Sequence, residues 1–179
     1  MTQVLPTELD GVRVTLRCWR VEQAATLSAL VQGNLDHLRP WMPWIALEPS
    51  TEVQRRELIA GWERGRIAGG DAIYSVQVDG VAIGCCGLHR RIGPDGLEIG
   101  YWIAESQCHK GYATEAAAVL TAAALSMDGI RCAEIHHDTA NLASAAVPRR
   151  LGYQFVDERP AVDPAPGGTG INWIWRTER

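Results

Sequence analysis

The spacing of apolar residues divides the chain into short strands and longer helices. Between residues 12 and 19 apolar and polar residues alternate, which predicts a strand with Val12, Val14 and Leu16 on one face. Asp79-Gly80 separates two further apolar runs, and this dipeptide favours the tight turn of a β-hairpin. The predicted strands span residues 12–19, 72–78, 81–89, 97–103, 130–136, 153–157 and 171–175.

Four other segments have the three-to-four-residue spacing of a helix. The strongest is 112–127, in which seven of sixteen residues are Ala, and Gly129 after it suits the left-handed residue that closes a helix. The predicted helices span residues 21–31, 51–66, 112–127 and 141–150. The order β-α-α-β-β-β-α-β-α-β-β predicts an α+β fold with a mostly antiparallel sheet.

Proline and glycine shape the last third of the chain. Pro148 lacks the N–H that would bond the carbonyl of Ser144. The helix over 141–150 is therefore expected to be short or kinked, with this carbonyl free to accept from another group. Segment 160–170 is rich in Pro and Gly and is expected to be a mobile loop.

Composition limits the function classes. The 179 residues suit one domain, 1–179, and 46% apolar residues suffice for one sizeable core. No apolar run reaches the roughly 20 residues that span a bilayer, and residues 1–10 have no signal-peptide pattern. Five cysteines without a C-x-x-C pair fit a reduced protein, and a net charge of −4 gives no sign of a nucleic-acid face. We therefore expect a cytoplasmic protein without membrane or nucleic-acid partners.

The most informative chemistry lies where a strand, a polar turn and an Ala-rich helix follow one another over 97–127. Free N–H groups and the positive end of the helix dipole make a helix N-terminus a phosphate site. We therefore expect a phosphorylated ligand at the turn around Gly111. A P-loop is excluded because Gly-x-x-x-x-Gly-Lys-Ser/Thr is missing, and no Gly-x-Ser-x-Gly elbow indicates a serine hydrolase.

Three motifs in order resemble the GNAT N-acetyltransferases. Residues 108–113 lie where that family has Gln/Arg-x-x-Gly-x-Gly/Ala, and 141–153 resembles its Asn-x-x-Ser/Ala … Gly-Phe block. Segment 38–44 resembles the Leu-x-Pro-Trp-x-x-Trp of the RimJ/RimL-like branch, which acetylates N-terminal amines of ribosomal proteins. The resemblance implies a mixed, strongly twisted, mostly antiparallel sheet of seven strands flanked by four helices.

The same resemblance implies the reaction. An acetyl group would move from acetyl-CoA to a primary amine by direct transfer in a ternary complex, without a metal. The acceptor is either a protein N-terminus or a small amine. A non-catalytic acyl-CoA-binding sensor or scaffold is the alternative, and the oligomeric state is open between monomer and homodimer.

The resemblance also assigns the site residues. Glu98 is the candidate general base, with a solvent-facing Glu at a strand edge as the alternative. Ser144 is the candidate proton donor to the leaving thiolate, with an ordinary first-turn Ser as the alternative. Trp41 and Trp44 are candidate walls of the acceptor pocket, with core packing expected for one of them. The residues expected to bind the cofactor are Ile103, Cys108, His109, Lys110, Gly111, Tyr112, Ala113, Thr114 and Asn141.

Two positions depart from the family pattern. Cys108 stands where Gln or Arg is usual, and a thiol cannot donate to a phosphate in the same way, so Lys110 is expected to compensate as a point charge. Pro148 stands where many members have the Tyr that protonates the thiolate, although the RimJ/RimL-like branch also tends to lack it. Adjacent strand residues point to opposite faces, so His136-His137 gives a solvated strand end and no metal site.

Overall fold

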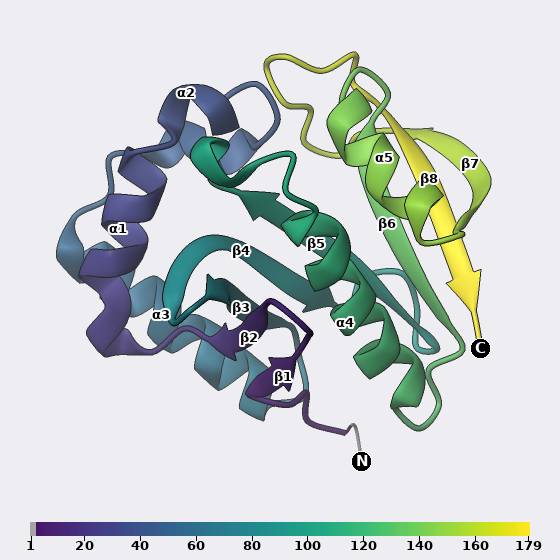
Figure 1. The fold of residues 1–179 in the computed structure, drawn as a ribbon, viewed down its shortest axis with the longest axis horizontal. Coiled ribbons are helices and arrows are strands. Elements are labelled where there is room, and N and C mark those ends of the chain that lie inside the picture. Colours follow the sequence, from purple (N-terminus) through teal and green to yellow (C-terminus); the bar gives the residue numbers. More distant parts are fainter. Residues whose placement is uncertain (1–2) are drawn as a thin grey trace.

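The computed structural model describes residues 3–179 (Figure 1). Eight strands form one sheet in the order β1-β2-β3-β4-β5-β6-β8-β7, with β5 and β6 as its parallel neighbours. The strands are β1 (Glu8–Asp10), β2 (Thr15–Cys18), β3 (Ala72–Val78), β4 (Val81–His89), β5 (Gly96–Ile103), β6 (Cys132–Asp138), β7 (Gln154–Pro160) and β8 (Ile171–Glu178). The α-helices are α1 (Ala24–Gln32), α2 (Leu35–Leu38), α3 (Glu52–Ile67), α4 (Tyr112–Ser126) and α5 (Leu142–Arg150). Three 3-10 turns are η1 (Val21–Gln23), η2 (Pro43–Leu47) and η3 (Glu105–Gln107).

The α+β class and the mostly antiparallel sheet are confirmed, but the strand and helix numbers were too low. The added strand is β1, three residues paired with β2, and the added helix is α2, a single turn. Both are too short to show a period in the sequence. Val12 lies in the turn between β1 and β2 and is 97% exposed, so its predicted place on one strand face with Val14 and Leu16 was wrong.

Helices cover the two faces of the sheet separately. In Figure 1, α4 crosses the near face and α3 lies behind the sheet. On the α4 side, Leu120 packs in the cluster that contains Ile99 of β5. On the α3 side, Ile59 packs with Leu27 of α1 in a second cluster. No helix among residues 3–179 is long and apolar enough to cross a membrane.

The parallel pair β5 and β6 separates after a short contact. Their register pairs only Gly96–Glu98 with Cys132–Glu134, whereas β5 stays paired with β4 as far as Ile103. The Ala104 N–H donates to Ile83 O at 2.8 Å, on the β4 side. Backbone groups alternate in direction along a strand, so the N–H groups of Tyr101 and Ile103 point to the β6 side. The sheet therefore has an opening along an unpaired edge of β5.

The segment between β7 and β8 is anchored on both sides of this opening. The Asp138 carboxylate at the end of β6 accepts from the N–H groups of Ala140, Thr169 and Gly170, at 2.8, 3.0 and 2.9 Å. The Gly167 N–H donates to the carbonyl of Pro40, which follows α2, at 2.9 Å. The composition predicted a mobile loop here, and these contacts give the loop fixed attachment points instead.

Candidate active site

The turn before α4 presents an uncapped helix N-terminus. Gly111 is the N-cap with φ 84°, and no side chain caps the helix. His109 also has a positive φ of 62°, a conformation that costs about 1–2 kcal/mol for a non-glycine residue. The first N–H groups of an α-helix have no partner within it. Since no side chain occupies them, the turn fits the diphosphate expected from the sequence.

The charge beside this turn comes from a residue that the sequence analysis missed. Arg13, in the β1–β2 turn, donates from Nη1 to Lys110 O at 3.0 Å and lies 5.1 Å from the Tyr112 ring centre. Its Nε and backbone N–H bond the carboxylate of Glu115, at 2.8 and 2.5 Å. Lys110, the expected point charge, instead bonds Gln107 at 2.8 Å through Nζ. The Arg13 guanidinium thus lies next to Gly111, with its charge paired to the Glu115 carboxylate.

Cys108 turns its thiol away from the turn. Its Sγ lies 3.5 Å from Ala104 O and 3.7 Å from His37 Nε2. Burial, with a further contribution from Glu105, raises the pKa of this thiol, so it stays protonated at neutral pH. The residue therefore packs as a small apolar side chain and leaves phosphate contact to the backbone.

Asn141 and Ser144 meet β5 through Tyr101. The Asn141 side chain accepts from the Ser144 N–H at 3.0 Å, which confirms its role as the N-cap of α5. The Tyr101 hydroxyl lies 3.1 Å from Ser144 O and 3.1 Å from Ser144 Oγ. The carbonyl that Pro148 leaves without a helix donor has thus found an external one, as the sequence predicted. Because burial raises the pKa of Tyr101, its phenol stays a donor.

Glu98 is buried and ion-paired on the other face of β5. Only 7% of the residue is exposed, so the solvent-facing alternative was wrong. Arg91 donates to its carboxylate from Nε and Nη2, at 2.8 and 2.5 Å. Burial by itself would raise the pKa of Glu98, but the hydrogen bond from Arg91 and the charge of His136 outweigh it and lower that pKa. The carboxylate therefore holds protons weakly.

His136 is part of an ion network and not a solvated strand end. Its Nε2 lies 2.6 Å from Glu134 Oε2, and its Nδ1 lies 3.5 Å from Glu98 Oε2. Glu134 also accepts from Arg176 at 2.8 Å. His137 points to the opposite face, where Trp175 donates to its Nε2 at 2.9 Å. The expected divergence of the two rings is confirmed, and their expected solvation was wrong.

A second histidine lies beside Glu98 on β4. His89 is the register partner of Glu98 across β4 and β5. Its Nδ1 lies 2.7 Å from Asp71 Oδ2, and the other oxygen of Asp71 accepts from the Arg90 N–H at 2.8 Å. The hydrogen bond to His89, with the Arg90 N–H, lowers the pKa of Asp71. The sequence analysis assigned neither Asp71 nor His89 to the site.

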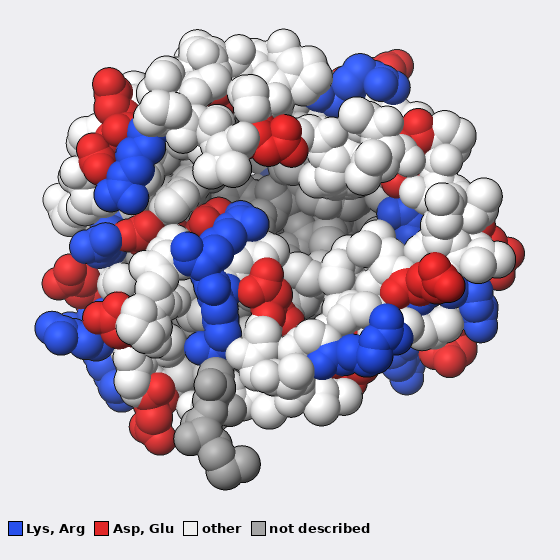
Figure 2. All heavy atoms as spheres, turned by 180° about the vertical axis from the view of Figure 1, so that it is seen from behind, with Lys and Arg blue, Asp and Glu red and all other residues white. Residues whose placement is uncertain are grey.

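This face of the sheet is hollowed. Figure 2, seen from the side opposite α4, shows a depression near the middle with acidic and basic side chains close together on one side of it. Trp44 packs against the α3-side cluster and lies 6.4 Å from Trp102 between ring centres, so core packing holds for this member of the expected pair. Trp41 is half-buried after α2, and its N–H donates to Leu38 O at 2.9 Å.

The family-model comparison decides the affiliation of this architecture. Residues 13–154 match the model of the acetyltransferase (GNAT) domain. The chain belongs to the GNAT acetyltransferases. It is thus an acyl-CoA-dependent N-acetyltransferase, with acetyl-CoA as the co-substrate that the turn and the opening fit.

Individual relatives agree with the GNAT assignment. A Bacillus subtilis (strain 168) protein, described provisionally as the ribosomal N-acetyltransferase YdaF, is 28% identical over 151 residues, 84% of this chain and 81% of its own. RimL, a ribosomal L7/L12 α-N-protein acetyltransferase solved with coenzyme A, has a TM-score of 0.85 at 20% identity and 98% coverage of both chains. RimJ of Mycobacterium smegmatis, solved with CoA-disulfide, has a TM-score of 0.83 at 20% identity, covering 97% of this chain and 88% of its own.

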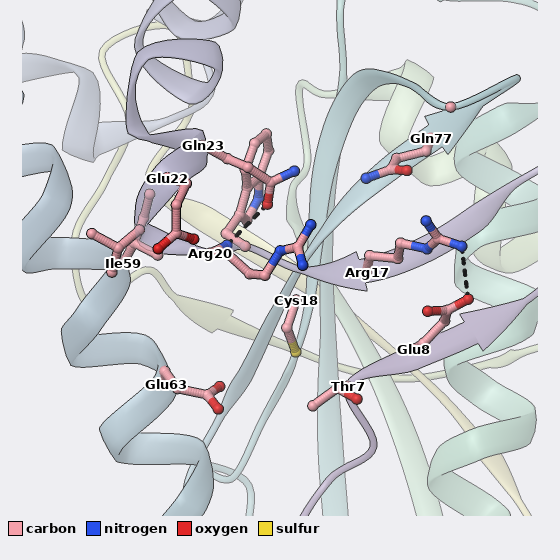
Figure 3. A pocket seen from close by; sticks show the side chains of 13 residues that line it. Thr7, Glu8, Arg17, Cys18, Arg20, Glu22, Gln23, Ile59, Glu63 and Gln77 are labelled. Carbon is pink, nitrogen blue, oxygen red and sulfur yellow. Dashed lines mark hydrogen bonds and ion pairs between the residues drawn. The ribbon is translucent and has the colours of Figure 1, made fainter.

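The GNAT domain has another hollow, remote from the opening. It measures about 650 Å³ and lies between β2, η1 and α3 (Figure 3). In the sheet order, β3 and β4 separate β2 from β5. Arg17 and Glu8 pair on one side of it at 2.9 Å. Burial raises the pKa of Cys18 to about 11, so its thiol is not a nucleophile at neutral pH.

The residues missed from the sequence share one property. Arg13, Asp71, His89 and Tyr101 each act through a partner far away in the chain. Two signals were present. The carbonyl freed by Pro148 required an external donor. The turn at 93–96 predicted that β4 and β5 pair, although a hairpin centred on that turn would put position 91 opposite Glu98, and the structure puts His89 there.

Proposed function

We propose that this GNAT enzyme transfers the acetyl group of acetyl-CoA to a primary amine by direct transfer in a ternary complex. The amine is a protein N-terminus or a small amine. The observation that carries the proposal is the uncapped N-terminus of α4 next to an unpaired edge of β5. A diphosphate at Gly111 would leave its tethered thioester beside 98–103.

The cofactor-binding part of the proposal rests mainly on the backbone. N–H groups of the turn before α4 would hold the diphosphate, with Arg13 adding charge. The Ile103 N–H, which points to the opening, would donate to the acetyl carbonyl. Asn141 keeps its amide N–H₂ for the pantetheine arm, because its Oδ1 already accepts from Ser144. The turn residues are Cys108, His109, Lys110, Gly111, Tyr112, Ala113 and Thr114.

Two catalytic candidates lie on opposite faces of β5. Ser144, held by Tyr101, would donate to the departing thiolate through Oγ. Glu98 would place negative charge beside the amine, which approaches from the hollowed face. Trp41 would wall the approach, whereas Trp44 packs in the α3-side cluster. The thiolate gains a proton, and the amine loses one in total.

The acceptor class rests on the relatives. RimL is described as an acetyltransferase of the ribosomal L7/L12 α-amino group, and YdaF carries a provisional ribosomal name. These names favour a protein N-terminus. A small amine stays open because nothing in the contacts described above separates the two.

Thiol release distinguishes catalysis from simple binding. Purified protein is mixed with acetyl-CoA and a panel of N-terminal peptides, alkyl amines, polyamines and aminoglycosides, and free CoA thiol is measured. We expect amine-dependent thiol release and an acetylated amine by mass. A thermal shift with CoA but no thiol release with any amine would favour the non-catalytic acyl-CoA-binding alternative.

A further inference from the structure

Three ionisable side chains lie in a row across β4, β5 and β6 on the face opposite α4. His89 is the register partner of Glu98, and His136 Nδ1 lies 3.5 Å from Glu98 Oε2. An amine that attacks from this face has to pass a proton to some group here, because an ammonium ion is not a nucleophile. The three side chains differ in how free they are to take it.

Glu98 and His136 are both engaged. Arg91 donates to both oxygens of the Glu98 carboxylate. Each ring nitrogen of His136 faces a carboxylate, Glu134 at 2.6 Å and Glu98 at 3.5 Å. Both groups are therefore already engaged by charged neighbours.

His89 is oriented with one nitrogen free. A carboxylate only accepts hydrogen bonds, so the 2.7 Å contact with Asp71 puts the neutral ring's proton on Nδ1. Nε2 then carries the lone pair. Within residues 3–179, no group forms a hydrogen bond with Nε2. Asp71 is itself fixed by the Arg90 N–H, so the pair is a preorganised carboxylate–imidazole dyad.

Two glycines place Nε2 over the backbone that borders the opening. Gly87 and Gly100 are register partners on β4 and β5. A Cβ would lie 3.0 Å from His89 Nε2 at Gly87 and 3.2 Å at Gly100, closer than ordinary contact. Any side chain at these positions would displace the imidazole. Gly100 lies just beyond Glu98, where β6 leaves β5, which is where the proposed thioester would lie.

We propose that His89 is the base that takes the proton of the acceptor amine, with Asp71 as its positioning residue. This inference rests on the proposed function. The ammonium N–H bond breaks, an N–H bond forms at Nε2, and Asp71 holds the resulting imidazolium through Nδ1–H. The neutral amine then forms the C–N bond as the C–S bond breaks, and its second proton goes to the thiolate. Glu98 contributes charge and takes no proton.

Charged groups face the His89 ring from two elements. Asp71 faces its ring from the residue before β3, and Glu98 faces it from β5. Arg91, which is paired with Glu98, also helps to lower the pKa of Asp71, and His136 lies beside Glu98 on β6.

The test compares pH profiles of kcat/KM for thiol release with two probe acceptors, a short peptide with a free α-amino group and n-butylamine. Their amines ionise near 8 and near 10, so a limb common to both profiles belongs to the enzyme. We expect His89→Gln to remove the common limb and to lower the rate at pH 7 by about 100-fold or more. His136→Gln and Glu98→Gln should keep that limb.

Asp71→Asn is tested by the pH position of the common limb, which would not change if Asp71 had a purely structural role. Without the carboxylate, the imidazolium is less favoured, so the common limb should shift to lower pH while CoA binding is unchanged. This variant also keeps the test decisive if His89→Gln does not fold.

Each remaining outcome counts against the idea in a distinguishable way. Wild-type protein that acetylates neither probe amine overturns the proposed function and this inference with it. An active wild type whose common limb survives in His89→Gln, or is unshifted in Asp71→Asn, overturns the inference alone. Loss of the limb in His136→Gln or Glu98→Gln instead assigns the base to that residue.

Discussion

The two sides of β5 carry sites of opposite construction. On the α4 side, the diphosphate turn is one continuous segment, 108–114, and its shape comes from a positive φ and the start of a helix. On the α3 side, the polar groups come from Asp71, His89, Glu98 and His136, which only strand register brings together. A continuous site can be identified from a motif, whereas a dispersed site requires the sheet.

The difference predicts how each site responds to mutation. The turn works through main-chain N–H groups, so backbone changes should damage it more than side-chain changes. The α3-side cluster works through side chains and should show the reverse. The following variants test this contrast.

The largest effect is expected from Gly111→Val. A β-branched residue is strained at φ 84°, and Arg13 Nη2 lies 3.2 Å from the new Cβ. We expect CoA affinity to fall by about 100-fold or more, equivalent to about 2.7 kcal/mol, measured by calorimetric titration with CoA. The matched control is Gly129→Val at the other end of α4, where φ is 78° and no atom lies within 4 Å of the added Cβ.

Both variants should lose stability from the same backbone strain, and only the first should lose CoA. Equal CoA affinity in the two proteins would mean that the turn does not hold the diphosphate. The proposal that the turn is a backbone-built binding site would then be wrong.

An intermediate effect is expected at Tyr101 and Ser144, the residues through which β5 contacts α5. Ser144→Ala removes the proposed donor to the thiolate, and Tyr101→Phe removes the group that holds it. Losing one such hydrogen bond costs about 1.4 kcal/mol, so kcat should fall about tenfold in each with CoA affinity kept. Single-turnover thiol release measures this.

Combining the Tyr101 and Ser144 substitutions in one protein gives a further test. If Tyr101 acts through Ser144, the double variant should be no slower than Ser144→Ala alone. Multiplicative losses would show that the two hydroxyls act independently, and unchanged kcat in both single variants would remove Ser144 from the proposed role.

The smallest effect is expected at Asp138, where backbone donors meet a side chain. Burial by itself would raise the pKa of Asp138, but the N–H groups of Thr169, Ala140 and Gly170 outweigh it and lower that pKa. A lowered pKa stabilises the fold above the unfolded value of about 3.9, and this stabilisation is lost as the pH falls through the folded value. Asp138→Asn should lower the free energy of unfolding by about 1 kcal/mol at pH 7, or Tm by about 2–4 °C.

Thermal unfolding from pH 7 to pH 3 measures that difference, which should shrink below pH 4. Asp157→Asn is the control, since its exposed carboxylate bonds only the neighbouring Arg159 side chain and Glu158 N–H. A constant difference between wild type and Asp138→Asn across the pH range would contradict the assignment.

Long elements with clear periodicity were predictable from the sequence. The hairpin at Asp79-Gly80 and the Ala-rich α4 follow from local preferences, and the structure confirms them. Gly129 has the expected positive φ, but the helix already ends at Ser126 with Met127 as its C-cap, so the predicted cap was misplaced. Pairing partners were not predictable in the same way. Whether Glu98 faces solvent or Arg91 depends on how the chain returns after β5, and a three-residue strand such as β1 has no period to detect.

The hydrogen bond from the Gly167 N–H to the Pro40 carbonyl affects access to the gap between β5 and β6. Pro40 follows α2, and Asn34 at the start of α2 accepts from the Glu105 N–H just after β5. Gly167 belongs to the loop that is fixed at the end of β6. With Glu98 and Glu134 joining the strands at the other end, the gap is bounded by a closed ring of hydrogen-bonded segments, in which the Asn34 and Asp138 side chains take part. A long, flexible molecule must thread this ring or unlatch it. Since one hydrogen bond is worth only about 1 kcal/mol net, breaking the Gly167–Pro40 contact would cost little and would open this end of the gap.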